Sequence, residues 1–224
     1  FRRVLFRSRR FFGAKALVSG NPVRKGLFDS IRAKDQRGTA PTGIVRVLVF
    51  GGSQGAHAIN VAMAEAAPLL AAASLPLQVV HQTGQKDVPF VRDAYKAAGL
   101  PAVVEPYFFD MERQLADADL VVCRSGATTL AELAAAGCPA ILIPLPTATD
   151  DHQRKNADAV ASAGAARVLL QADATGARLS SLVVALATDA DLRQQMSAAA
   201  RRLARPDAAS VIVDRALAIV GEAR

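Results

Sequence analysis

Three short segments of this chain combine small residues with hydrogen-bond donors, a pattern that suits a phosphorylated ligand. The first, residues 51–55, has the sequence Gly-Gly-Ser-Gln-Gly and lies between a β-branched apolar run and a predicted helix. Glycines let a ligand approach the backbone closely, and N–H groups at a helix N-terminus attract phosphate. We expect Gly51, Gly52 and Gly55 to form a phosphate loop in which the Ser53 hydroxyl is a further donor. The alternative is an ordinary tight turn from strand to helix.

The second segment, residues 124–132, follows a predicted strand and runs into another helix. Gly126 leaves room for a ligand at the helix N-terminus, and the hydroxyls of Thr128 and Thr129 could donate to a phosphate. Glu132 could accept two hydrogen bonds from the hydroxyls of a ribose. Thr129 and Glu132 also have the spacing of a capping box, which is the structural alternative for this pair.

The third segment, residues 150–156, opens a helix with polar side chains. Gln153 could hydrogen-bond a sugar, or the segment could be a solvated helix start whose acidic residues complement the helix dipole. Two arginines, Arg24 and Arg124, could neutralise a diphosphate. Arg24 could instead cap a turn, and Arg124 could instead pair with an acid.

Several other ligand classes are disfavoured. Residues 51–55 lack the G-x-G-x-x-G spacing of a dinucleotide fingerprint, and residues 81–84 end the next predicted strand without the carboxylate that would hold a ribose. No Gly-Lys-Ser/Thr follows the glycines, which excludes a P-loop. Asp150, Asp151 and His152 are consecutive, and no second ligand cluster accompanies them, so we expect no metal and no cofactor.

The histidines and cysteines are expected to be structural. For His57, His81 and His152, a structural role is the simpler interpretation. Cys123 ends a predicted buried strand, and Cys138 precedes a proline with no evident base nearby. No nucleophile is therefore expected.

The three segments must be positioned by elements that alternate from residue 44 onward. Strands are predicted at residues 44–50, 77–81, 102–105, 119–123, 140–143 and 167–169. Helices are predicted at residues 56–73, 88–98, 111–116, 129–136, 153–163, 179–188, 189–204 and 208–221. This alternation predicts an α/β fold, a Rossmann-like doubly wound parallel sheet of about six strands. Such sheets bind ligands beyond the carboxyl ends of their strands, where the three segments would lie.

The composition indicates a globular protein with a substantial core. The chain has 224 residues, 51% of them hydrophobic, and no apolar run approaches the roughly 18 residues of a membrane span. Residues 1–10 hold five arginines and no acid. Removing those five from 27 basic residues leaves 22 against 20 acidic ones, so the net charge falls from +7 to +2. Nucleic-acid binding is therefore not expected. Residues 1–10 could contact an anionic membrane surface, or they could be a non-native leader.

Taken together, the motifs resemble the MurG family of bacterial N-acetylglucosaminyltransferases in peptidoglycan synthesis. The resemblance covers about residues 11–224 and rests on motifs at residues 20–24, 51–56, 81–84, 123–127, 132 and 151–156. It implies that residues 44–224 are the UDP-sugar-binding C-terminal domain of a GT-B glycosyltransferase, with C-terminal helices. Residues 1–43 would be an N-terminal segment with a remnant of the interdomain linker.

The reaction that the resemblance implies moves N-acetylglucosamine from UDP-N-acetylglucosamine to lipid I, undecaprenyl-pyrophosphoryl-N-acetylmuramoyl-pentapeptide. The product is lipid II, and the anomeric centre inverts. The acceptor site and the main membrane patch belong to the family's N-terminal domain. We therefore expect no catalytic residue in this chain and no turnover by the chain alone. The enzyme would be cytoplasmic, peripheral on the cytoplasmic face of the bacterial inner membrane.

The resemblance also implies roles for individual residues. Arg24 and Ser53 would face the diphosphate or the sugar, and Gln153 would contact sugar hydroxyls. Phe108 would hold the uracil through its backbone, next to Phe109, which replaces an acid usual in the family. A continuous stretch would cradle the diphosphate, with its last residue on the ribose: Ala127, Thr128, Thr129, Leu130, Ala131 and Glu132.

Two alternatives stay open. A nucleotide-sugar epimerase of related fold would need acids and a histidine placed for proton transfer at the sugar, which residues 81–84 do not supply. A non-catalytic module could bind nucleotides or nucleic acid. Deleting residues 1–10 would abolish nucleic-acid binding but leave UDP-sugar binding in place.

Overall fold

The computed structural model describes residues 17–37, 43–52 and 55–222 of the chain. Its centre is one six-stranded sheet in the order β3-β2-β1-β4-β5-β6, in which every neighbouring pair is parallel. The strands are β1 Val45–Phe50, β2 Leu77–Gln82, β3 Ala102–Glu105, β4 Leu120–Cys123, β5 Ala140–Leu142 and β6 Ala166–Val168. The predicted doubly wound parallel sheet is therefore confirmed.

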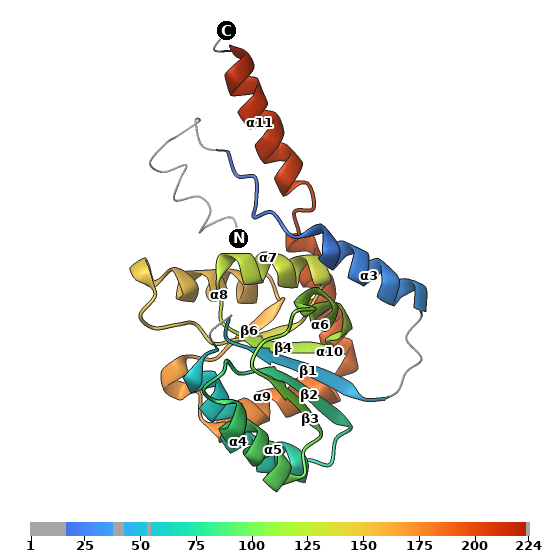
Figure 1. The fold of residues 1–224 in the computed structure, drawn as a ribbon, viewed down its shortest axis with the longest axis vertical. Coiled ribbons are helices and arrows are strands. Elements are labelled where there is room, and N and C mark those ends of the chain that lie inside the picture. The colour runs from blue at the N-terminus through green and yellow to red at the C-terminus, as the bar shows by residue number, and fades with distance from the viewer. Residues whose placement is uncertain (1–16, 38–42, 53–54, 223–224) are drawn as a thin grey trace.

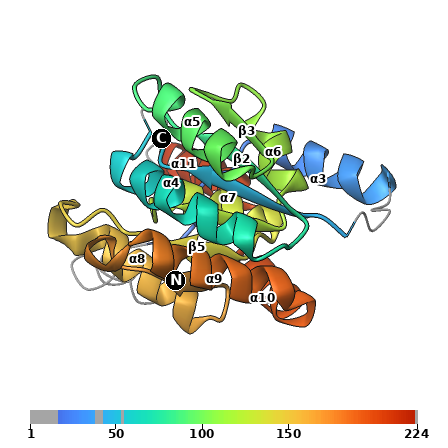
Figure 2. The ribbon, with the colours of Figure 1, turned by 90° about the horizontal axis from the view of Figure 1, so that it is seen from below.

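Helices cover both faces of the sheet (Figures 1 and 2). They are α3 Lys25–Arg37, α4 His57–Ala72, α5 Val88–Ala98, α6 Met111–Asp117, α7 Ala127–Ala136, α8 His152–Ser162, α9 Gly176–Thr188, α10 Ala190–Leu203 and α11 Ala208–Glu222. Two short 3₁₀ helices, η2 Thr149–Asp151 and η3 Gln171–Asp173, lie in the loops. None of these helices is long and apolar enough to cross a membrane.

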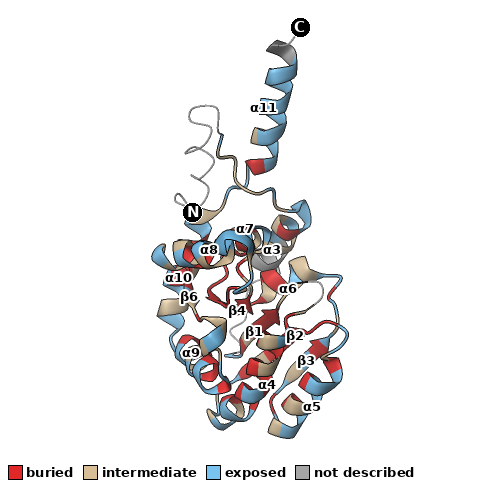
Figure 3. Ribbon diagram, turned by 90° about the vertical axis from the view of Figure 1, so that its left-hand side faces the viewer, coloured by how far each residue is buried: buried red, intermediate tan, exposed pale blue. Residues whose placement is uncertain are grey.

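The apolar run at residues 47–50 of β1 follows from burial on both faces. Val47 and Val49 belong to a core that includes residues of α4, α5 and α9. Leu48 and Phe50 belong to a second core with residues of α3, α6, α7 and α8. Figure 3 shows the strands as the buried layer between the helices. The central strands are therefore packed from both sides, as is usual for a parallel sheet.

Several elements differ from the sequence-based expectation; α9, for example, begins at Gly176 rather than at residue 179. Helix α3 lies where no element was predicted, and its Leu27, only 1% exposed, anchors it to the second core. Helix α7 begins at Ala127, two residues earlier than predicted. At the far end, α11 projects from the body of the molecule (Figure 1), with an exposed apolar face that includes Leu217 and Val220.

The order of the strands sets the place for a ligand. The chain passes from β1 to β2 and β3 on one side, then returns through β4 to the other side of β1. The loops after β1 and β4 therefore diverge and leave a crevice at the carboxyl ends of these strands. Crevices at such switch points are the usual ligand sites of open α/β sheets.

Candidate functional site

A cavity of about 600 Å³ occupies this crevice. Three expected segments meet there: the glycine loop after β1, the start of α7 and the start of α8. The lining residues are Phe50, Gly51, Gly52, Gly55, Ala56, His57, Ala58, Arg124, Gly126, Thr129, Leu145, Gln153 and Gln171. Among these described lining residues, two are basic and none is a carboxylate, so the cavity suits an anion.

The glycine loop needs its glycines for steric reasons. Gly52 and Gly55 have φ of 108° and 78°, a region that L-residues rarely adopt. A Cβ on Gly55 would collide with the Thr83 carbonyl, and one on Gly51 would collide with Ala56. Ala56 supplies no side-chain cap, so the first N–H groups of α4 face the cavity without one. The phosphate loop stays a prediction, and its Ser53 lies outside the described residues.

Helix α7 presents a second uncapped N-terminus to the cavity. Its N-cap is Gly126, which makes no side-chain hydrogen bond, and Thr129 is the third helical residue. The capping-box alternative for Thr129 and Glu132 is therefore wrong. Two helix N-termini that converge on one cavity provide a strong partial positive charge.

The other residues of this stretch lie differently. Ala127 and Thr128 are exposed at the start of α7. Leu130 is 3% and Ala131 is 9% exposed, and Leu130 packs in the second core. A ligand could contact Leu130 and Ala131 only through their backbone.

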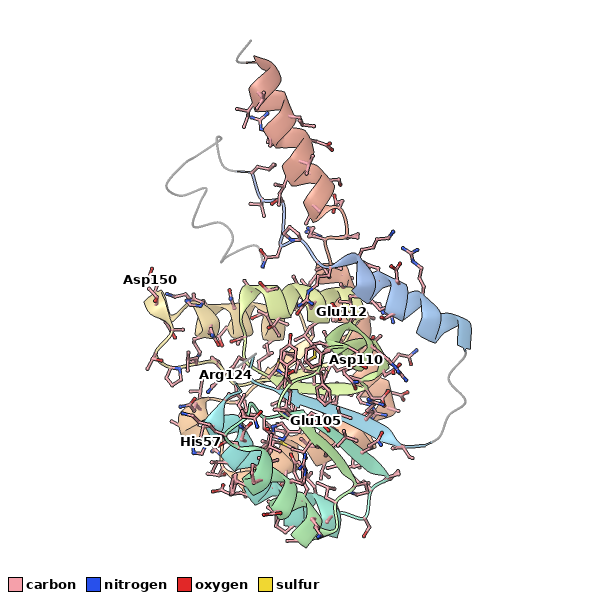
Figure 4. All side chains as sticks on the ribbon, in the orientation of Figure 1. His57, Glu105, Asp110, Glu112, Arg124 and Asp150 are labelled. Atoms are coloured by element: carbon pink, nitrogen blue, oxygen red, sulfur yellow. The ribbon has the colours of Figure 1, made fainter. Side chains whose placement is uncertain are left out.

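Glu132 lies outside the cavity lining, within reach of two other charged side chains. Burial raises the pKa of its carboxyl, Arg24 lowers it and Glu112 raises it, with a net rise. Arg24 Nη1 donates to Glu112 Oε1 at 2.8 Å. Arg24 therefore lies between two carboxylates rather than at the cavity, and its backbone carbonyl accepts from Leu27 N. Figure 4 shows Glu112 on α6, beneath α3.

Phe108 is linked to the glycine loop through a residue that sequence reasoning missed. Its backbone N–H donates to Gln82 Oε1 at 2.8 Å, and Gln82 Nε2 donates to the Gly52 carbonyl at 3.0 Å. Phe109 is 93% exposed and meets Tyr107 edge-on, with ring centroids 5.1 Å apart. Gln82 belongs to the quoted motif at residues 81–84, but nothing in that pattern indicated its two partners.

Gln153 and Arg124 are held by the loops around the cavity. Gln153 Oε1 accepts from Leu145 N at 3.1 Å, which fixes the amide and leaves its Nε2 as a donor. Arg124 donates to the carbonyls of Ile143 and Pro144 and to Gln171 Oε1. The expected alternative, that Arg124 pairs with an acid, is therefore wrong, because all three of these acceptors are neutral oxygens.

A second unexpected feature is a polar network between α4, β2 and α5. His57 Nδ1 lies 2.9 Å from Asp87 Oδ2, which also accepts from Asn60 Nδ2 at 2.7 Å. Asn60 Oδ1 lies 3.0 Å from His81 Nε2, and His81 Nδ1 lies 2.7 Å from the Tyr95 hydroxyl. Sequence reasoning treated each histidine alone, because residues 57, 60, 81, 87 and 95 show no shared spacing.

Cys123 and Cys138 are both buried and form no disulfide, and burial raises the pKa of Cys123. In the described part of the chain, no three His, Cys, Asp or Glu side chains gather as a metal site would require.

Comparison with known proteins agrees with this geometry. Residues 46–212 match the glycosyltransferase family 28 C-terminal domain. A Pelobacter propionicus protein named UDP-N-acetylglucosamine--N-acetylmuramyl-(pentapeptide) pyrophosphoryl-undecaprenol N-acetylglucosamine transferase is 44% identical over 94% of this chain and 60% of its own length. The crystal structure of Acinetobacter baumannii MurG has a TM-score of 0.73 and 36% identity, over 79% of this chain and 53% of that one.

A putative UDP-N-acetylglucosamine 2-epimerase from Listeria monocytogenes shares the fold alone, with a TM-score of 0.61 and 14% identity over 91% of this chain and 50% of that one. The chain spans 60% of the length of the Pelobacter propionicus relative. The resemblance seen in the sequence motifs is confirmed. The chain belongs to glycosyltransferase family 28, and it carries the C-terminal domain of that family.

Proposed function

We propose that this chain is the donor-binding part of an inverting glycosyltransferase. The enzyme would transfer N-acetylglucosamine from UDP-N-acetylglucosamine to lipid I and so form lipid II. The observation that carries the proposal is the cavity, where the glycine loop and the N-termini of α4 and α7 converge without an acidic side chain in the described lining. That surface suits a diphosphate, and the Pelobacter propionicus relative is named for a nucleotide sugar that contains one, UDP-N-acetylglucosamine.

The rest of the donor would extend from the diphosphate in two directions. The uracil would lie toward the Phe108 backbone, which Gln82 holds next to the loop. The ribose would reach Glu132, with Arg24 nearby. The N-acetylglucosamine would lie toward Gln153, whose Oε1 is bonded to Leu145 and whose amide N–H groups can donate to a sugar hydroxyl.

The acceptor would be bound by a part of the enzyme outside this chain, which spans about half to 60% of the matched proteins. We place the catalytic base and the main membrane contact there also. Lipid I is membrane-anchored, so the enzyme would be peripheral on the cytoplasmic face of the inner membrane. Residues 1–43 would be the segment that leads in from the preceding domain, and nucleic acid would not be a partner.

Calorimetric titration tests the proposal. The chain should bind UDP and UDP-N-acetylglucosamine saturably and prefer the latter to UDP-N-acetylgalactosamine. Glu132→Ala should weaken all three, because each carries the ribose. A chain that is folded by circular dichroism but binds no uridine nucleotide would contradict the proposal.

A further inference from the structure

His57 is the exposed end of the polar network that runs into the core. Its side chain is 75% exposed and lines the cavity, whereas Asn60 and His81 behind it have no exposed surface. Burying polar groups costs free energy even when each is hydrogen-bonded, and apolar side chains could fill the same space without that cost. The network therefore calls for an explanation other than stability.

The direction of the hydrogen bonds can be assigned from the atoms involved. Asn60 Oδ1 only accepts, so His81 carries its proton on Nε2 and accepts the Tyr95 hydroxyl proton at Nδ1. Burial lowers the pKa of His81 to about 3, which agrees with a neutral ring. Asn60 Nδ2 then donates to Asp87, so the donors of the buried chain all point toward one carboxylate.

Asp87 is ionised at neutral pH. Burial raises the pKa of the Asp87 carboxyl. The hydrogen bonds from Asn60 and His57 lower this pKa by more than burial raises it, so the net change is downward. A carboxylate can only accept, so His57 Nδ1 is the donor in the 2.9 Å contact. This bond fixes the ring and leaves Nε2 for a partner outside the network.

The position of His57 indicates what that partner is. His57 begins α4 directly after the glycine loop, and it lines the same cavity as Gly51 and Gly52. The other basic side chain in the described lining is Arg124, which is already bonded to two carbonyls and an amide oxygen. Figure 4 shows His57 and Arg124 on the same side of the molecule. Asp87 binds Nδ1 of His57, so Nε2 is the ring nitrogen left to donate into the cavity, where the loop offers only backbone N–H groups.

We propose that His57, oriented by Asp87, donates from Nε2 to the diphosphate of the nucleotide sugar. The inference rests on the proposed function, since it requires a diphosphate in the cavity. Asp87 acts as a positioning residue through His57, and the buried Asn60 and His81 hold Asp87 in turn.

The test compares the affinity of the full chain for UDP and for uridine. His57→Gln removes the imidazole donor, and His57→Arg places a cationic donor at the same position. His152→Gln is the matched control, since His152 also begins a helix, is exposed and bonds a neighbouring oxygen through Nδ1, but does not line the cavity. We expect His57→Gln to weaken UDP binding about tenfold, the size of one lost charge-assisted hydrogen bond, and to leave uridine binding unchanged. His57→Arg should recover most of the loss, and His152→Gln should match the wild type.

Asp87→Asn provides the second arm, because it keeps the shape of the side chain and removes the charge. It should reduce UDP affinity selectively, as His57→Gln does. If wild type binds UDP and His57→Gln binds it equally well, the inference is wrong while the proposed function stands. Equal losses for UDP and uridine would also overturn it, since they would report local damage to the fold. A wild-type chain that binds neither ligand would overturn the proposed function itself.

Discussion

The backbone N–H of Phe108 donates to Gln82 Oε1 at 2.8 Å, and so a single buried amide ties the segment after β3 to the end of β2. The other half of the same amide donates to the Gly52 carbonyl at 3.0 Å. Gln82 is 2% exposed, and its bond to Phe108 is buried. This side chain sets the separation between the glycine loop and the segment proposed to hold the uracil.

Replacing Gln82 with Leu should therefore weaken nucleotide binding as well as the fold. The substitution leaves the buried Phe108 N–H without a partner, which costs about 1–3 kcal/mol, and it releases the exposed Gly52 carbonyl to solvent. We expect a lower free energy of unfolding in urea and a UDP affinity reduced about tenfold, as when one charge-assisted hydrogen bond is misplaced. The matched control is Gln78→Leu, in the same strand but at the opposite end of the sheet. If Gln82→Leu loses stability while UDP affinity equals that of the control, Gln82 has only a structural role.

The second prediction concerns Gly55 of the glycine loop. Comparison with Gly99 separates the effect of a Cβ that collides with a neighbour from the effect of a positive φ alone. Gly55 and Gly99 both have positive φ, 78° and 67°. A Cβ on Gly99 would meet nothing within 4 Å, whereas one on Gly55 would collide with the Thr83 carbonyl. Gly99→Ala should cost about 1–2 kcal/mol of unfolding free energy from strain alone and leave UDP affinity unchanged. Gly55→Ala should cost more and abolish detectable UDP binding in a calorimetric titration. Equal stability losses in the two variants would contradict the packing described here.

The sheet could be predicted from the sequence because a strand that is buried on both faces has consecutive apolar residues. Residues 47–50 and 120–123 show such runs, and both belong to central strands. Helix α3 could not be predicted in the same way, since it is mostly polar and is anchored by Leu27 against a core assembled from distant residues. The start of α7 was misplaced because Ala127 and Thr128 carry no helix-start signal of their own.

The residues of the candidate site likewise fall into two groups, those with a local sequence pattern and those brought together only by the fold. The position of Gly51, Gly52, Gly55, Gly126 and Thr129 at the cavity could be expected from the sequence, because glycine and hydroxyl residues between a strand and a helix are typical of a phosphate site, and their role in binding stays a prediction. Gln82 and the network of His57 could not, since their bonds join residues that are 14 to 30 positions apart in the chain. The register of β1 against β2 brings Gln82 to the glycine loop, and the packing of α4 against α5 brings the residues of the network together.

Glu132 and Arg24 lead to a prediction about pH. The pKa of Glu132 is raised, and the positive charge of Arg24 limits that rise. If the ionised carboxylate holds the ribose, Arg24→Gln should raise this pKa further, and binding should be lost at a higher pH as the solution is acidified. Uridine is the ligand to titrate, since it has no phosphate that Arg24 could contact directly. Glu132→Gln should bind uridine weakly with little dependence on pH. Identical pH profiles for wild type and Arg24→Gln would contradict the role of Glu132.

The buried His81 predicts how stability depends on pH. Its pKa is about 3 in the fold, against an ordinary value near 6.5, because burial disfavours the charged ring. Between these two values the unfolded chain binds a proton that the folded chain does not, so stability is complete above about pH 6.5 and falls as the pH decreases. One pKa unit corresponds to about 1.4 kcal/mol, so His81 should cost roughly 2 kcal/mol between pH 6.5 and pH 5. Asp87, whose pKa is also lowered, adds its own loss only below the ordinary value of an aspartate, about 4.

Urea unfolding at a series of pH values measures this slope. His81→Gln should be less stable than wild type at pH 7, because the bonds to Asn60 and Tyr95 are lost or weakened. Its stability should nevertheless change much less between pH 6.5 and pH 5, since the titrating group is absent. His152→Gln removes an exposed histidine and should keep the wild-type slope. A His81→Gln variant with the full wild-type slope would show that another group takes up the proton, and the assignment of a neutral, buried His81 would then be wrong.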